Sequence, residues 1–245
     1  MIHESVIIEN GAIIGENVSI GPFCHISAKT SIGDNCTLES NVILNGKINI
    51  ANDVKLFSFV TLGCDKSEIS VGEKTHIREF CQIGSQEAED GSSQKITVGA
   101  NNFLMAYVQI ASGVELGDFC ILTNAVKLYE NVICADRVII GGLSTVEANN
   151  KLGTGVMIGG ASFVNHDMPP FTLIEGNNAT IKGLNIVGLR RRIENKDDIQ
   201  AIKTIFKEVF RTDGGVDKEL AASIAEKHAN GYVKTFADFI AKSNI

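Results

Sequence analysis

Aliphatic residues return at every sixth position along most of this chain. The series runs from Ile8 to Leu62, resumes from Val71 to Ile83, and continues from Val98 to Val164. A second small or β-branched residue, such as Val18 or Cys24, stands two positions before most of them. Residues two apart on an extended chain point to the same face. The pattern therefore predicts short strands, each followed by a turn, that wind around a narrow apolar interior.

Three hexads make an 18-residue coil, so residues 18 apart become neighbours along one side of the stack. The register is lost at Met168-Pro169-Pro170, where two prolines stop the strands. Beyond them, apolar stripes predict a helix capped near Asn195 and two more, near 218–228 and 233–241. We therefore expect an all-β parallel β-helix of hexapeptide repeats at residues 1–167 and a small α-helical C-terminal domain at 168–245.

Two gaps interrupt the repeat. The first, from Cys64 to Ser70, adds three residues to the hexad spacing, and the second, from Ser85 to Thr97, adds nine. The polar composition of the second gap is typical of a projecting loop. That loop is either a tolerated surface insertion or a segment that reaches a ligand or a neighbouring subunit.

Composition narrows the function further. The formal charge of -7 and pI near 5.3 argue against a nucleic-acid partner, because phosphate surfaces recruit lysine and arginine clusters. No segment approaches the roughly 20 apolar residues of a spanning helix, so we expect no integral membrane segment and a cytoplasmic location. Six cysteines form no CxxC pair, and their places in the repeat predict that most are small buried hydrophobes.

More specific motifs follow the hexads. They are Asn165–Phe171 with its two prolines, Glu175–Ala179, and Leu184–Arg192, which reads Leu-Asn-Ile-Val-Gly-Leu-Arg-Arg-Arg. Together with the hexads, they make nearly the whole chain resemble the acyl-[acyl-carrier-protein]:UDP-N-acetylglucosamine O-acyltransferases of the lipid A pathway. The resemblance implies a left-handed β-helix, a homotrimer with active sites between subunits, and two partners, acyl carrier protein and a nucleotide sugar.

In that family a histidine held by an aspartate is the general base, because a sugar hydroxyl is too weak a nucleophile to attack a thioester unaided. The matching positions here are Ser112 and Gly113. Further family histidines of the cleft fall at Gln109, Asn131 and Glu147.

From the repeat, we expect the altered positions to stack in one column over four successive coils. The members of this column are Gly84, Gln109 with Ser112, Asn131 and Glu147. Glu147 and Glu130 are the candidates for a replacement base, and Ser112 is a weaker candidate for a catalytic nucleophile because it needs an activating base.

The resemblance also implies a substrate-binding set in the tail. Asn185, Arg191 and Arg192 match the family signature, and the arginines either pair with a diphosphate or an acidic carrier protein or merely solvate a helix. Val187 replaces the expected glutamate, and Cys64–Glu68 replaces a longer sugar-contacting loop. Gly160 matches a position that limits acyl-chain length, where a glycine leaves room for a longer chain.

A zinc site, as in hexapeptide-repeat carbonic anhydrases, would need several histidines around one metal. His25 and His76 are expected on different faces, and the other three histidines lie near the ends or in the tail. We therefore expect no metal and no cofactor.

The sequence leaves two functions open. The first is a divergent acyltransferase that moves a (hydroxy)acyl chain from acyl carrier protein to a nucleotide sugar. The alternative is a catalytically silent paralogue that binds carrier protein, acyl chain or nucleotide sugar without turnover.

Overall fold

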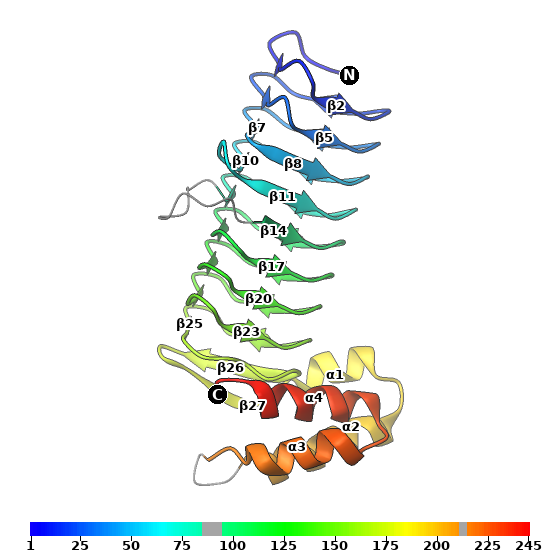
Figure 1. Cartoon of the computed structure of the whole chain (residues 1–245), viewed down its shortest axis with the longest axis vertical. Helices are drawn as coiled ribbons and strands as arrows, with labels where there is room; N and C mark the ends of the chain where they lie inside the picture. The colour runs from blue at the N-terminus through cyan, green and yellow to red at the C-terminus, as the bar shows by residue number, and fades with distance from the viewer. Residues whose placement is uncertain (85–94, 211–214) are drawn as a thin grey trace.

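The computed structural model describes residues 1–84, 95–210 and 215–245. The first part of the chain forms a stack of coils with three flat sides, and each side is a sheet whose coil strands run parallel (Figure 1). The N-terminus lies at one end of this prism, and the helical tail closes the other end. Most of the loop predicted between Ser85 and Thr97, up to residue 94, lies outside the described residues.

The three sheets take one strand in turn from each coil. The nine-stranded sheet contains β1 (Ile7–Ile8), β4 (His25–Ile26), β7 (Ile43–Leu44), β10 (Thr61–Leu62), β13 (Gln82–Ile83), β16 (Gln109–Ile110), β19 (Lys127–Leu128), β22 (Thr145–Val146) and β25 (Phe163–Val164). The eight-stranded sheet contains β2 (Ile13–Ile14), β5 (Ser31–Ile32), β8 (Lys47–Ile50), β11 (Glu68–Val71), β14 (Lys95–Val98), β17 (Glu115–Leu116), β20 (Ile133–Cys134) and β23 (Lys151–Leu152). The ten-stranded sheet contains β3 (Ser19–Ile20), β6 (Thr37–Leu38), β9 (Lys55–Leu56), β12 (His76–Ile77), β15 (Phe103–Leu104), β18 (Ile121–Leu122), β21 (Ile139–Ile140), β24 (Met157–Ile158), β26 (Thr172–Gly176) and β27 (Ala179–Leu184).

The hexad pattern is confirmed as the core of the prism. In most strands the first side chain faces outward and the second is buried, as in β18, where Leu122 is fully buried. The residue two positions earlier, Cys120 in this coil, is buried as well. Ile8 is 38% exposed because it lies in the first coil, at the open end of the stack.

Five of the six cysteines occupy these buried positions, as predicted: Cys24, Cys36, Cys81, Cys120 and Cys134. Their role is to fill the core, and the Cys81 and Cys120 thiols also lie within bonding distance of the backbone carbonyls of Met105 and Ala135, at 3.1 and 3.3 Å. Burial raises the pKa of both Cys81 and Cys120 to about 12. These thiols are therefore not ionised near neutral pH and are not candidate nucleophiles.

The β-sheet continues beyond the predicted domain boundary. β26 pairs in parallel with β24, and β27 returns antiparallel to β26 as far as Leu184. Helices begin only at Ile186. The last coil is also joined to the end of the chain, because the buried Asp167 carboxylate accepts hydrogen bonds from the Lys151 and Asn244 amides at 2.7 and 2.8 Å. The division at 167/168 stays a prediction.

The tail contains four helices: α1 (Ile186–Arg192), α2 (Lys196–Val209), α3 (Lys218–Lys227) and α4 (Gly231–Lys242). The three predicted helices are α2, α3 and α4, and the Asn195 side chain caps α2 by accepting from the Asp197 amide at 2.9 Å. A second apolar core, which includes Phe171, Leu189 and Phe236, joins the helices to the last coil.

Candidate functional site

Most of the positions expected to form the cleft lie along one corner of the prism, the corner between the nine-stranded and eight-stranded sheets. We call this the site corner, and it includes residues 9–12, 27–30 and 45–46 in the first coils and 111–114, 129–132, 147–150 and 165–168 in the last ones. Register is set by the flanking strands, in which Gln109 pairs with Lys127, and Lys127 with Thr145. Residues 18 apart therefore occupy equivalent positions of this corner.

The expected single column is wrong in detail. Glu147 follows β22 as Tyr129 follows β19, so these two are equivalent, and Gly84 occupies the same position after β13. Ser112 is one position further along and is equivalent to Glu130. The hexad count had placed these residues in the right corner, but it did not separate the successive positions of a four-residue turn.

Asn131 occupies a third position of the turn, because its amide bonds to the Ser112 carbonyl at 3.0 Å and its side chain donates to Asn149 at 3.1 Å. Gln109 lies outside the turn, on the outward face of β16. The expected column therefore consists of three parallel rows of positions on one corner, and Gln109 lies beside them on the strand.

Ser112 and Glu130 are the two predicted site residues that the fold brings next to each other. Adjacent coils in a β-stack lie about 4.8 Å apart, so Glu130 occupies the place directly beside Ser112 on the next coil. Ser112 is half-buried, and both Glu130 and Glu147 are exposed in the single chain. Within the described part of the chain, none of these three side chains has a hydrogen bond or ion pair.

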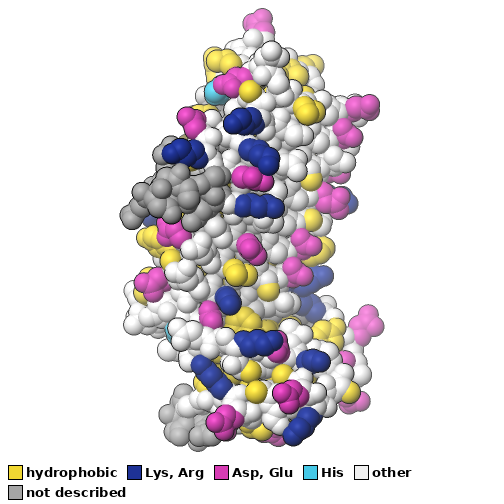
Figure 2. Space-filling view, viewed as in Figure 1, with side chains coloured by type: hydrophobic (Ala, Val, Ile, Leu, Met, Phe, Trp, Pro, Cys, Tyr) yellow, Lys and Arg dark blue, Asp and Glu magenta, His cyan; other side chains and the backbone are white. Residues whose placement is uncertain are grey.

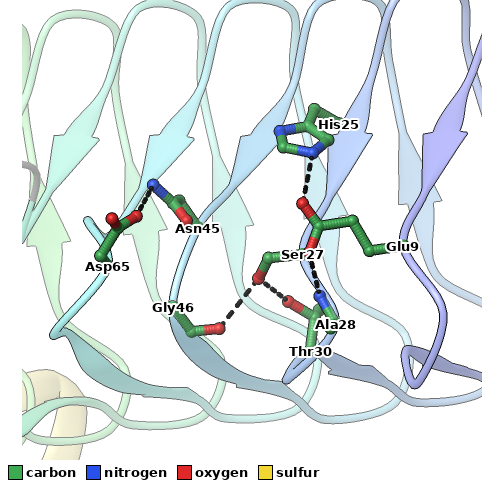
Figure 3. Close-up of polar contacts among 8 residues, drawn as sticks. All are labelled: Glu9, His25, Ser27, Ala28, Thr30, Asn45, Gly46 and Asp65. Atoms are coloured by element: carbon green, nitrogen blue, oxygen red, sulfur yellow. Dashed lines mark hydrogen bonds and ion pairs between the residues drawn. The ribbon is translucent and has the colours of Figure 1, made fainter.

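The same corner is different in the first coils (Figure 3). His25 Nε2 lies 3.0 Å from Glu9 Oε1, and the other carboxylate oxygen of Glu9 accepts from the Ala28 amide at 2.9 Å. Buried Ser27 donates to the Gly46 carbonyl at 2.9 Å, and Asn45 donates to Asp65 at 2.9 Å. These polar side chains are engaged in joining one coil to the next.

The sheet that faces the viewer in Figure 2 has a different surface. Charges of both signs are dispersed over it, and its outward side chains include the ion pair of Lys47 with Glu68 at 3.1 Å. This dispersed pattern is typical of a solvent-exposed protein surface.

Asn185, Arg191 and Arg192 lie at a second corner, between the eight-stranded and ten-stranded sheets. Asn185 caps α1 by accepting from the Gly188 amide and donates to the Gly155 carbonyl at 3.1 Å. Arg192 donates to the carbonyl of Arg137 at 3.1 Å. Burial lowers the pKa of Arg192, and the nearby charge of Arg137 lowers it further.

The arginines line a cleft of about 470 Å³ between the last coils and the tail. Its polar lining comes from Arg137, Arg191 and Arg192 with Thr154, Tyr232 and Thr235, and its apolar lining includes Phe171. We call it the arginine cleft. Gly160 lies at the third corner, between β24 and β25, and is exposed. The predicted site residues are thus distributed over all three corners.

Sequence reasoning missed two residues in these places. His166 is 18 residues beyond Ala148 and therefore shares the row of Ser112 and Glu130, two coils past Glu130; its Nδ1 lies 2.9 Å from Asn165 Oδ1. Counting in steps of 18 from Ser112 would have found it. Arg137 is the other, and only the folded tail places it against Arg192.

Among the described residues, no helix is long and apolar enough to cross a membrane.

Comparison with protein families finds two matches along the chain. A model described as UDP N-acetylglucosamine O-acyltransferase, domain 2, matches residues 167–245, and one for bacterial transferase hexapeptide repeats matches residues 11–46. Both fit the architecture of a repeat prism with a helical tail.

Several solved structures have the same fold over the whole chain. The UDP-N-acetylglucosamine acyltransferase of Campylobacter jejuni superposes with a TM-score of 0.92 at 34% identity, covering 100% of this chain and 97% of that one. The acyltransferase of Bacteroides fragilis gives 0.90 at 27% identity, with 99% and 98% coverage.

Relatives in sequence agree with these structures. The acyl-[acyl-carrier-protein]--UDP-N-acetylglucosamine O-acyltransferase of Aliarcobacter butzleri is 39% identical over 98% of this chain and 94% of its own length. The protein of the same name from Nautilia profundicola is 41% identical over 87% of this chain and 78% of its own length. This chain therefore belongs to the acyl-[acyl-carrier-protein]--UDP-N-acetylglucosamine O-acyltransferase family.

Proposed function

We propose that this protein transfers a (hydroxy)acyl group from acyl carrier protein to the 3-hydroxyl of a nucleotide sugar of the UDP-N-acetylglucosamine type. The observation that carries the proposal is identity of 39% over 98% of the chain to a protein named for that reaction. The retained tail signature supports it, because Asn185, Arg191 and Arg192 stand where the family resemblance expects nucleotide or carrier contacts.

The proposal includes a homotrimer. Ser112 and Glu130 lie at one corner of the prism, the tail arginines at another, and Gly160 at the third. A single sugar and acyl chain could touch these groups together only if a neighbouring copy brought its tail to the site corner. This distribution favours an active site shared between subunits, as the family resemblance implies.

Glu130 is our candidate for the general base in the absence of the family histidine. Its carboxylate would accept the proton of the sugar 3-hydroxyl while that oxygen attacks the thioester carbonyl. The thioester C–S bond then breaks, and the carrier thiolate leaves and is protonated. Glu130 is favoured over Glu147 because it occupies the place beside Ser112, whereas Glu147 is in the row of Tyr129.

One observation favours a second candidate, a silent paralogue that binds carrier protein, acyl chain or nucleotide sugar without turnover. Ser112 and Gly113 stand at the positions of the histidine and aspartate that the resemblance implies, and a serine hydroxyl cannot act as the general base that the sugar hydroxyl needs. In that case the histidine and aspartate of the family, reintroduced together as Ser112→His and Gly113→Asp, would create activity. Gly113 has φ of +73°, a conformation that aspartate tolerates better than most residues.

The decisive experiment incubates the full chain with hydroxyacyl carrier protein and a panel of UDP-sugars, and measures the acylated sugar by mass spectrometry. Turnover that falls in Glu130→Gln but persists in Glu115→Gln, an exposed glutamate of β17 in the sheet beside this corner, supports the base. Loss in Glu147→Ala instead would transfer the role to Glu147. Sugar binding without any turnover would establish the silent paralogue.

A further inference from the structure

The arginine cleft brings together arginine side chains from a coil and from the tail, Arg137 and Arg192. At the corner between the eight-stranded and ten-stranded sheets, residues 119, 137 and 155 occupy equivalent positions of three successive coils. The Arg137 guanidinium lies over the Phe119 ring at 4.4 Å from its centroid. The third member, Gly155, has no side chain and leaves space at the next place in the row.

Arg192 enters that space from α1. A Cβ atom on Gly155 would collide with Arg192 Nη1 where it now lies, so the glycine leaves room for this approach. Arg192 then donates to the carbonyl of Arg137, while Asn185 fixes the start of α1 on the carbonyl of Gly155. The order of groups along this corner is therefore the Phe119 ring, the Arg137 side chain and the Arg192 side chain.

These cations have no counter-charge in the described part of the protein. No carboxylate lines the cleft, and none of Arg137, Arg191 and Arg192 forms an ion pair with an aspartate or glutamate there. Like charges at close range repel each other, and partial burial of Arg192 increases the cost. The side-chain hydroxyls of Thr154 and Tyr232, which also line the cleft, have no hydrogen-bond partner among the described residues.

We infer that Arg137 and Arg192 together form a binding site for a phosphoryl anion, in which Arg137 is a contact residue that the tail signature alone does not include. Two guanidinium groups that line one cleft match the several oxygens of a diphosphate better than one, because each offers a planar pair of donors. An anion there would also relieve the repulsion between the two cations. This inference deepens the proposed function, on which it rests for the identity of the ligand but not for the existence of the site.

Two sources could supply this chemistry: the diphosphate of a nucleotide sugar, or the phosphodiester of a carrier protein's pantetheine arm. The test measures binding of inorganic pyrophosphate, UDP and 4′-phosphopantetheine to the full chain by titration calorimetry. The variants are Arg137→Gln and, as a matched control, Arg190→Gln. The control removes an exposed arginine of α1 that does not line the cleft.

We expect Arg137→Gln to weaken pyrophosphate and UDP binding by about ten- to a hundredfold, as removal of a charge-assisted hydrogen bond does, and Arg190→Gln to bind like the unchanged protein. Selective loss of 4′-phosphopantetheine binding would assign the site to the carrier arm and also support the inference. Equal binding by Arg137→Gln and the unchanged chain would overturn it, as would equal losses in both variants.

Thermal melting without ligand separates binding from a structural role. If Arg137 serves a ligand, Arg137→Gln keeps or raises the melting temperature of the free protein and lacks the rise that pyrophosphate gives the unchanged chain. A lowered melting temperature with an undiminished pyrophosphate effect would contradict the inference. Neither readout involves acyl transfer, so an inactive protein that still binds through Arg137 would refute the proposed turnover and leave this site standing.

Discussion

Two groups of polar side chains at or beside the site corner differ in how they are used. In the first coils, Glu9, His25, Ser27 and Asn45 each bond to a neighbouring coil. Further along, Asn131 still donates to Asn149 on the next coil, but the side chains of Ser112, Glu130 and Glu147, which we call the unpaired stretch, have no such partners within the described residues. The same repeat builds both stretches, so backbone geometry does not explain the difference. Polar side chains that bond between coils stabilise the stack, whereas those left without partners are available to a substrate.

The largest effect is expected from Glu130→Gln in the unpaired stretch. If the carboxylate is the general base, its loss lowers kcat by about 10²- to 10⁴-fold. The free energy of unfolding should change by less than about 0.5 kcal/mol, because the side chain is exposed and has no partner among the described residues. Steady-state kinetics and urea unfolding of the same preparation measure both. A stability loss that matches the activity loss would remove the distinction between the stretches.

Next in size is Asp167→Ala, at the tail end of the same corner. The buried carboxylate accepts from the Lys151 and Asn244 amides, and its removal leaves both without this acceptor. We expect a loss of about 2–4 kcal/mol in the free energy of unfolding, measured in urea. Asp167→Asn keeps one acceptor oxygen and should lose less. Equal stability of Asp167→Ala and the unchanged chain would show that the C-terminal attachment contributes nothing.

Ser27→Ala should have a smaller effect, of about 1–2 kcal/mol, because it removes one buried hydrogen bond to the Gly46 carbonyl and a contact with Thr30 at 3.1 Å. Ser31→Ala is the matched control, since Ser31 lies on the outward face of β5 in the next strand. Thermal or urea unfolding of the two variants gives the comparison. Identical losses in the two variants would show that the hydrogen bonds of Ser27 add nothing to stability.

The smallest effect is expected from Glu9→Ala. The pair with His25 is exposed, with side-chain exposures of 44% and 38%, so its removal should cost less than about 1 kcal/mol. The part of this cost that comes from a charged imidazole should disappear in 1 M salt, which screens charges beyond about 3 Å. A larger, salt-independent cost would point instead to the hydrogen bond between Glu9 and the Ala28 amide.

The repeat made the prism predictable from sequence. A period of six with two inward positions requires burial on three sides, and the structure confirms it from Val18 to Val164. The hairpin of β26 and β27 was not predicted, because the two prolines at 169 and 170 end the hexads without ending the ten-stranded sheet. β26 pairs with β24, which is close in space but distant in sequence. The residues of the hairpin contain no sequence pattern that indicates this pairing.

The candidate site was predictable only in part. Spacing placed Ser112, Asn131 and Glu147 on one corner, but the order of positions within a four-residue turn depends on where each strand ends. Arg137 and Arg192 are 55 residues apart and meet only because α1 folds back against Gly155. No periodicity relates a helix to a coil, so this contact required the structure.

The most direct test of the difference between the two stretches measures activity and stability for Ser27→Ala and Glu130→Gln side by side. We predict opposite results: Ser27→Ala unfolds at lower urea and keeps the kcat of the unchanged chain in its folded form, whereas Glu130→Gln unfolds at the same urea concentration and loses turnover. Glu130→Gln that retains full turnover, or that unfolds as early as Ser27→Ala, would contradict the assignment of chemistry to the unpaired stretch.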